Sequence, residues 1–240
     1  MKVVMNSVAV VSLFVLTALA FEFHELSHHF FGWVACRHLG SVTFTRFEVA
    51  EGCGVWPSRI VELFGPLVSM VLAYAGAVWA LKRHSLFGFG LTFASYFHLR
   101  FMPALMGGGS DEVDLVRHTG WLHGSRYAVA AILLALGLPP LVMTARALQG
   151  RWRWAVFAVA YLLPLPVLAL SDKFDQLFTG PHPILPALAA ASLLNVPLIV
   201  LIVNLALTIA FVLMARSLQR RGLIVRLGDV EQAAAGPETP

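Results

Sequence analysis

Residues 3–20, VVMNSVAVVSLFVLTALA, form a long apolar run that leads directly into FEFHELSHHF at residues 21–30. A helix of about 20 apolar residues spans the hydrocarbon core of a bilayer. Imidazole and carboxyl groups are costly in that environment, so the histidines and glutamates at the end of the run are candidates for a functional site. The stretch predicts a membrane-spanning helix that carries polar chemistry.

The whole chain has the composition of a membrane protein. It is 58% hydrophobic and only 12% charged, whereas soluble domains are about a quarter charged. Backbone groups in lipid must pair internally, so we expect an all-α polytopic protein surrounded by the lipid bilayer. The basic residues behind the net charge of +4 lie mostly in short loops and the tail. That distribution indicates membrane orientation and gives no indication of nucleic-acid binding.

Six apolar segments are long enough to be transmembrane helices, at about 4–36, 60–81, 86–106, 127–144, 154–170 and 188–214. Between the first two, SVTFTRFEV at residues 41–49 alternates and is rich in β-branched and aromatic residues, which predicts a strand. EGCG at residues 51–54 predicts a turn after it. We therefore expect a small β-hairpin-like loop between the first two helices, with an irregular loop as the alternative.

The polar end of the first segment contains H-E-x-x-H, from His24 to His28. Residues four apart share one face of a helix, so both imidazoles can reach one metal ion, and Glu25 lies where a general base is needed. Catalytic zinc takes three protein ligands and keeps a fourth position for water, so zinc is the expected cofactor. His29 lies about 100° around the helix from His28 and is expected beside the site or at the membrane interface. A chance match at an interfacial helix end is the alternative.

A third ligand is expected from MGGGSDEVDL, residues 106–115, at the end of the third apolar segment. Helices one and three run in the same direction, so their ends lie on the same side of the membrane. Asp111 follows the glycine run after a single serine and is favoured on that position, with Asp114 one turn later as an alternative ligand. Ser110 and Asp111 are also residue types that cap helices, and capping alone would explain them.

Four features now stand in a recognisable order: HELSH at residues 24–28, the expected hairpin, FGPLVSMVLA at 64–73 and GGGSDEVDL at 107–115. In this order they resemble the site-2 protease family of intramembrane zinc metalloproteases, over residues 1–120. The resemblance implies that His24, His28 and Asp111 bind zinc and that Glu25 is the base. It also implies that the substrate is a transmembrane protein or peptide, cleaved within or near its spans.

Two positions depart from the family pattern. Ser69 stands where the family often has asparagine after Gly-Pro, and Glu112 stands where glycine usually follows the aspartate. These departures bear on the substrate groove more than on the zinc ligands. We expect residues 1–120 to form the catalytic membrane core, 121–216 to add further transmembrane helices, and 217–240 to form a flexible tail. A bacterial-type cell membrane is the expected location, and the sequence does not indicate an oligomeric state.

Five residues are expected to line a substrate groove: Gly65, Pro66, Ser69, His98 and Arg100. Gly65 and Pro66 either kink the start of the second helix beside the site or simply initiate it. His98 and Arg100 lie within the third segment and are candidates to polarise the scissile carbonyl. Alternatively, Arg100 pairs with a buried acid such as Glu22 or Glu62. An unwound substrate segment is expected to pair with the free edge of the loop strand.

The sequence allows two membrane orientations and two forms of the N-terminus. The Lys and Arg distribution favours both termini in the cytosol, whereas family members whose motif helix comes first often have the opposite orientation. Cys36 and Cys53 would be able to bridge if their loop faces an oxidising compartment. The MK start, the apolar run and ALA at residues 18–20 also fit a cleavable signal peptide.

Two other functions fit the same residues. A membrane metal-binding or metal-transport protein would use the His and Asp residues without hydrolysis and would tolerate loss of Glu25. A catalytically silent adaptor for transmembrane partners would bind no metal. The mechanism encoded in the H-E-x-x-H spacing favours the protease over both.

Overall fold

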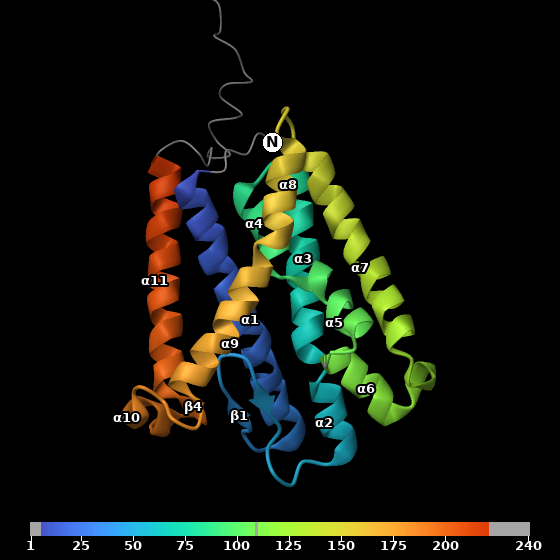
Figure 1. Cartoon of the computed structure of the whole chain (residues 1–240), viewed down its shortest axis with the longest axis vertical. Helices are drawn as coiled ribbons and strands as arrows, with labels where there is room; N and C mark the ends of the chain where they lie inside the picture. Colours follow the sequence, from blue (N-terminus) through green and yellow to red (C-terminus); the bar gives the residue numbers. More distant parts are fainter. Residues whose placement is uncertain (1–5, 109, 221–240) are drawn as a thin grey trace, which may run out of the picture.

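The computed structural model describes residues 6–108 and 110–220, which fold mainly into α-helices packed around the long helix α1 (Ser7–Cys36; Figure 1). Five helical stretches of this part are long and apolar enough to cross a membrane: Ser7–Cys36, Val55–Arg83, Arg126–Ala147, Arg153–Phe178 and Leu198–Leu218. The helical membrane-protein architecture predicted from the sequence is therefore confirmed, with five such stretches where six were expected.

The helices that follow α1 are α2 (Val55–Val61), α3 (Phe64–Arg83), α4 (Leu86–Ala94), α5 (Phe101–Met106), α6 (Asp111–Thr119), α7 (Arg126–Ala147), α8 (Arg153–Leu162), α9 (Pro164–Phe178), α10 (Pro186–Ala190) and α11 (Leu198–Arg220). Two 3₁₀ turns, η1 (Phe97–Leu99) and η2 (Trp121–Gly124), interrupt them. The strands form two antiparallel pairs, β1 (Ser41–Val42) with β2 (Phe47–Glu48) and β3 (Ser192–Leu193) with β4 (Val196–Pro197).

The third predicted span, 86–106, is not one helix. Helix α4 ends at Ala94, the backbone passes through a left-handed conformation at Tyr96 (φ 44°), and η1 and α5 continue in a new direction. The residues at the break are polar or amphipathic, and Tyr96, His98 and Arg100 are all buried inside the bundle. Apolar composition predicted a continuous helix here, but the break is what turns these side chains toward the protein interior.

Helices α3 and α4 pack closely because two glycines face each other. A Cβ atom on Gly76 would lie 2.7 Å from the carbonyl oxygen of Gly88, and one on Gly88 would lie 2.7 Å from the carbonyl oxygen of Gly76. Small residues let helix backbones approach in this way, which is how membrane helices gain packing energy. The α3–α4 pair supports α1, whose Leu13 and Leu16 pack in the same buried cluster as Phe89 and Phe93.

The predicted hairpin between the first two helices exists, but its turn lies elsewhere. The stretch predicted as one strand is itself the hairpin: Val42 pairs with Phe47, and Thr43 N–H donates to the Arg46 carbonyl at 2.8 Å. The EGCG segment instead turns the chain toward α2, and its Cys53 forms a disulfide with Cys36 at the end of α1. The composition of residues 41–49 correctly indicated strands, but it did not show where the reversal falls.

The last predicted span, 188–214, begins later than expected. Residues up to 197 form α10 and the β3–β4 hairpin, whose turn has left-handed Leu194 and Asn195, and α11 starts at Leu198. Hydropathy did not reveal this turn, because Asn195 is the one polar residue between Leu193 and Leu198. Helix α11 continues through Arg220, so the predicted tail at 217–240 starts later, and its remainder lies outside the described residues.

The second half of the chain holds the β1–β2 hairpin in place. The buried Asp175 carboxylate on α9 accepts hydrogen bonds from Phe44 N–H at 3.1 Å and from the Thr45 hydroxyl at 3.0 Å. The Asn195 amide donates to the Leu39 carbonyl at 3.0 Å. Val42, Phe44 and three residues from β4 and α11 share one buried cluster (Val196, Ile199 and Val200).

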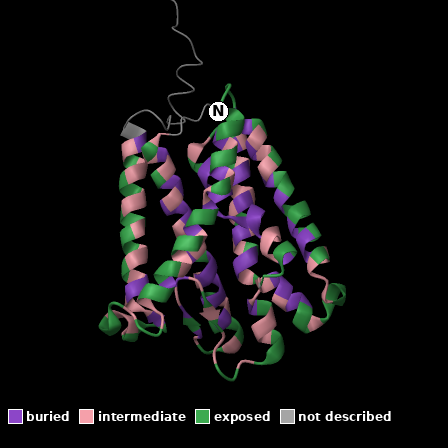
Figure 2. Ribbon diagram, in the orientation of Figure 1, coloured by how far each residue is buried: buried purple, intermediate pink, exposed green. Residues whose placement is uncertain are grey.

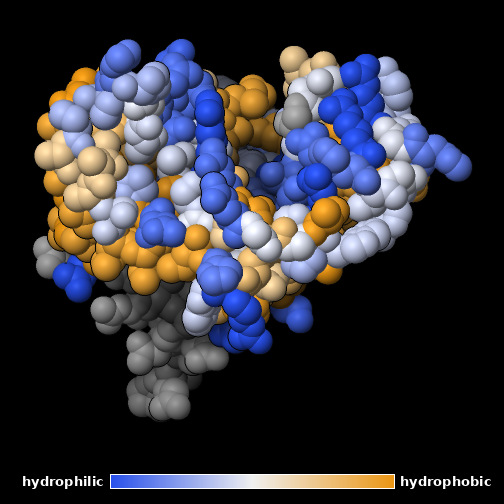
Figure 3. Space-filling view, turned by 90° about the horizontal axis from the view of Figure 1, so that it is seen from below, coloured by the Kyte–Doolittle hydropathy of each residue, from blue (hydrophilic) through white to orange (hydrophobic). Residues whose placement is uncertain are grey.

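The distribution of burial fits a helix bundle surrounded by lipid. Buried residues line the inward faces of α1, α3 and α4, whereas the outer faces of α7 and α11 are exposed and apolar (Figure 2). The end of the bundle that carries α2, α6 and the β1–β2 hairpin is different. Seen from that end, the surface is hollowed and hydrophilic residues border the hollow (Figure 3).

Candidate metal centre

The H-E-x-x-H residues lie in the buried second half of α1. His24, Glu25 and His28 are only 2%, 7% and 3% exposed. The helix is uninterrupted here, so His24 and His28 stand one turn apart on the same face, and their Nε2 atoms are 3.2 Å apart. The predicted pairing of the two imidazoles is therefore present in the structure.

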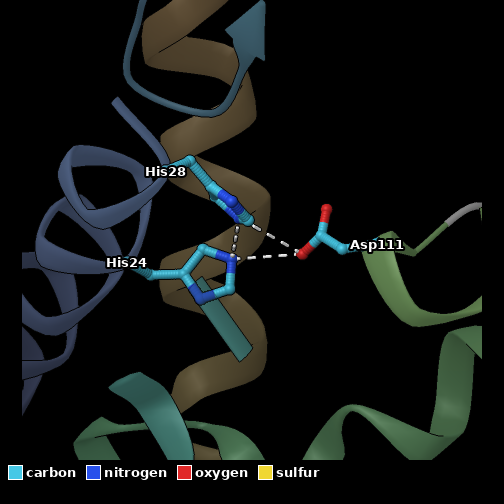
Figure 4. A group of neighbouring side chains, drawn as sticks. All are labelled: His24, His28 and Asp111. Carbon is cyan, nitrogen blue, oxygen red and sulfur yellow. Dashed lines mark hydrogen bonds and ion pairs between the residues drawn. The ribbon is translucent and has the colours of Figure 1, made fainter. Parts of the chain in front are cut away.

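Asp111 meets these imidazoles from a different part of the chain (Figure 4). It is the first residue of α6, whose N-cap is Ser110, so the predicted capping role belongs to Ser110 and leaves the Asp111 carboxylate free to face α1. Its Oδ2 lies 3.3 Å from His24 Nε2 and 3.5 Å from His28 Nε2. One ligand atom from each residue falls within 4.8 Å of the others. Two imidazole nitrogens and one carboxylate oxygen form a donor set that suits zinc.

The outer nitrogens of both imidazoles are held by groups on α2 and α3. His28 Nδ1 lies 2.8 Å from the Val61 carbonyl, and His24 Nδ1 lies 3.0 Å from the Ser69 hydroxyl. A carbonyl only accepts hydrogen bonds, so His28 Nδ1 carries the proton and its Nε2 presents a lone pair to the centre. Contacts of this kind fix the tautomer and ring orientation of metal-binding histidines.

Gly65 is required at its position because the imidazoles pack directly against it. A Cβ atom there would lie 2.6 Å from His24 Nε2 and would overlap the ring of His28. Pro66 is the third residue of α3, in its first turn, where proline is well tolerated, so its role is helix initiation. Gly65 and Ser69 therefore contact the two imidazoles, whereas they were predicted to line a substrate groove.

Arg100 joins the centre from the break between η1 and α5. Its Nη2 donates to Asp111 Oδ2 at 2.6 Å, and its Nε and Nη2 donate to the two carboxylate oxygens of Glu112 at 2.5 and 2.9 Å. The predicted pairing of Arg100 with Glu22 or Glu62 is therefore wrong. Glu22 instead accepts from the Asn204 amide at 3.0 Å, and Glu62 pairs with Arg59 at 2.6 Å. The structure thus brings Arg100 to His24 and Asp111.

The surroundings of Asp111 keep it ionised. Burial alone would raise the pKa of its carboxyl group, but the Arg100 guanidinium and, after it, the two adjacent imidazoles outweigh that effect. Together they hold the pKa of Asp111 well below its usual range. The carboxylate is therefore available as an anionic ligand throughout the neutral pH range.

Glu25 has the environment of an unengaged acid–base group. Within residues 6–108 and 110–220, no hydrogen bond or ion pair engages its buried carboxyl group. It borders two cavities, one of about 210 Å³ and one of about 430 Å³, and Asp111 borders both as well. The smaller cavity is lined by His24, Tyr96 and Arg100, and the larger one by His28 and residues 45–49 of the hairpin.

Three other candidates lie outside the ligand set. His98 Nε2 lies 3.1 Å from the Tyr161 carbonyl on α8, and His98 borders neither of the two cavities beside Glu25. Asp114 is one turn beyond Asp111 and pairs with Arg117 at 3.7 Å, so Asp111 is the residue that meets the imidazoles. His29 is buried against Phe47, whose ring also stacks on His28, but its imidazole is not among the donor groups that converge.

Sequence reasoning missed three contributors to the centre. Glu112 was seen only as a departure from the family pattern, yet it binds Arg100 through both oxygens. The Val61 carbonyl has no side-chain signal at all. Tyr96, whose hydroxyl lies 3.4 Å from Arg100 Nη1, was counted as part of an apolar helix. The charge of Glu112 beside the expected ligand Asp111 was the one signal available in the sequence.

Comparison of the chain with protein-family models, with curated proteins and with solved structures found no match in any of the three. The resemblance to site-2 proteases therefore rests on the motifs in the sequence. The convergence of His24, His28 and Asp111 is an observation from the structure alone.

Proposed function

We propose that this protein is an intramembrane zinc metalloprotease that hydrolyses peptide bonds within or near transmembrane segments of its substrates. The observation that carries the proposal is the convergence of His24, His28 and Asp111 beside the unpaired carboxyl group of Glu25. Zinc is the proposed metal, and a bacterial-type cell membrane is the proposed location. A structural zinc site would be closed by a fourth protein ligand, whereas three ligands beside cavities suit catalysis.

Each residue has a defined part in the proposed reaction. His24, His28 and Asp111 would hold the metal, and a bound zinc ion would supply Lewis acidity that makes a water molecule acidic near neutral pH. Glu25 accepts the proton from the attacking water and delivers it to the amide nitrogen of the leaving segment. Its position on the border of both cavities gives it access to water and to a substrate.

The larger cavity supplies a route for the substrate. A peptide bond in a membrane helix is covered by the hydrogen bonds of that helix, so the substrate must unwind before water can attack. Strand β2 pairs with β1 on one side, and residues 45–49 line the cavity that also touches Glu25 and His28. An unwound segment added along β2 would lie next to the centre, with backbone hydrogen bonds providing affinity.

The test is a comparison of the parent chain with Glu25→Gln, each purified and analysed for zinc and for cleavage of a model transmembrane peptide in liposomes. We expect both to bind zinc and Glu25→Gln to cleave about 10²–10⁴-fold more slowly, because a general acid–base group contributes that much. Glu51→Gln, an exposed carboxylate in the turn before α2, is the matched control and should cleave at the parent rate. Equal cleavage by Glu25→Gln would refute the assignment.

The same experiment distinguishes the metal-handling alternative. A transport or storage protein would bind zinc without cleaving any transmembrane peptide, and Glu25→Gln would leave its metal binding unchanged. We favour the protease because a transporter has no need for an unpaired carboxyl group between two ligand histidines.

A further inference from the structure

Arg100 is a buried cation in a place where a metal ion is expected. Its side chain is 8% exposed, and its three nitrogens face four different residues. Nε and Nη2 contact Glu112, Nη2 contacts Asp111, and Nη1 lies 3.4 Å from both the Tyr96 hydroxyl and His24 Nε2. Burying such a group is costly unless it is paired, and here two adjacent carboxylates pair it.

Asp111 has few other restraints. It is the first residue of α6, it follows the glycines at 107–108, and its side chain is 33% exposed. In the described part of the chain, Arg100 is the only group besides the two imidazoles that contacts its carboxylate. The oxygen held by Arg100 is Oδ2, which is the same atom that faces His24 and His28.

We propose that Arg100, locked in place by Glu112, is a positioning residue that presents Asp111 Oδ2 to the metal. The inference rests on the proposed metal centre. It adds that Glu112 holds Arg100 in place and that Arg100 in turn holds Asp111. The bidentate Glu112 contact fixes the plane of the guanidinium, and the third donor then fixes one carboxylate oxygen of the ligand.

The positive charge of Arg100 and its positioning of Asp111 predict opposite effects of an Arg100 substitution on zinc affinity. A guanidinium 3.4 Å from a ligand nitrogen repels a metal cation, so charge alone predicts tighter zinc binding when Arg100 is neutralised. Positioning predicts weaker binding, because Asp111 is then free to rotate toward solvent. The sign of the change in zinc affinity therefore decides between the two effects.

The experiment measures zinc affinity of the purified chain by competition with a chelator. Groups that hold metal ligands in place typically contribute 10–100-fold to affinity, so we expect Arg100→Gln to weaken zinc binding by about that factor. The double variant Arg100→Gln with Glu112→Gln removes one positive and one negative charge, so the net charge is unchanged and Glu112 is not left as an unpaired buried anion. We expect the same loss from it, which then cannot come from a change in net charge.

Two further variants separate positioning from general damage. Arg117→Gln removes an arginine that also pairs with an acid on α6, and it should bind zinc like the parent. In an Asp111→Asn background, Arg100→Gln should cause no further loss, because Arg100 acts through Asp111. Cobalt absorption spectra of the loaded variants should change with Arg100→Gln and stay unchanged with Arg117→Gln.

The inference is overturned if Arg100→Gln or the double variant binds zinc as tightly as the parent or more tightly. Circular dichroism on every variant shows whether the helices remain, and the double variant provides the answer if Arg100→Gln alone does not fold. A parent chain that binds no zinc would overturn the proposed metal centre itself. That failure appears before any variant is compared, so the two outcomes are distinguishable.

Discussion

Replacing Gly65 with alanine places a methyl group in the space that the two ligand imidazoles occupy. The new Cβ would lie 2.6 Å from His24 Nε2, whereas an ordinary contact begins at 3.4 Å, so the ring or the backbone of α3 must shift by about 0.8 Å to restore an ordinary contact. Metal–ligand distances tolerate about 0.2 Å. The displacement is several times larger, and the overlap with His28 is more severe still. We therefore expect Gly65→Ala to lower zinc affinity by at least about 100-fold, the upper end of what indirect changes cause.

The assay is zinc content by mass spectrometry, followed by chelator competition, on protein purified in detergent. Overpacking of a buried site costs about 1–3 kcal/mol, so thermal unfolding should show a modest loss of stability. Gly137→Ala on α7 is the matched control, because its Cβ would meet its nearest neighbour, His98 Cα, at an ordinary 3.5 Å. It should keep full zinc binding. Parent-like zinc affinity in Gly65→Ala would show that the imidazoles are not held against this glycine as described.

Two other substitutions test the supports of the centre and of the hairpin. Ser69→Ala removes the hydroxyl 3.0 Å from His24 Nδ1 and should weaken zinc binding by about 10-fold or more, as measured by chelator competition. Unchanged zinc affinity would contradict a role for Ser69 in orienting the His24 ring. Asp175→Asn removes one of the two carboxylate oxygens that hold the β1–β2 turn, and it should lower the free energy of unfolding by about 1–3 kcal/mol. Asp172→Asn is the control, because it loses only a hydrogen bond to Gln176 and should keep the stability of the parent. Equal stability of the two variants would refute the role of Asp175 in holding the hairpin.

The part of the site that the sequence predicts well is the part governed by local spacing. Two histidines four residues apart on a helix must share a face, and no tertiary contact is needed to know it. Asp111 was also predicted, because it follows a glycine run at the end of an apolar segment that ends on the same side as α1. The structure brings these three residues together. Their chemistry, and the presence of zinc, remain a prediction.

The part that the sequence does not predict depends on where the backbone changes direction. The left-handed Tyr96 breaks what hydropathy describes as one span, and that break decides which way His98 and Arg100 point. Without it, Arg100 was paired with the wrong acids and His98 was placed in the groove. The reversal within residues 43–46 was missed because its residues are typical of strands. The turn at Leu194 and Asn195 was missed because Asn195, although it favours turns, is a single polar residue within an apolar run.

Because Asp175 on α9 holds the β1–β2 hairpin, the chain cannot be divided near residue 120 without losing that contact. The carboxylate that fixes Phe44 comes from a helix 131 residues further along, and β4 and α11 close the apolar layer beneath the same loop. A fragment ending after α6 would retain every proposed zinc ligand yet would leave the wall of the larger cavity without its anchor. The two halves of the sequence thus share one packed layer, in which the later helices support the hairpin beside the residues that converge near the start of the chain.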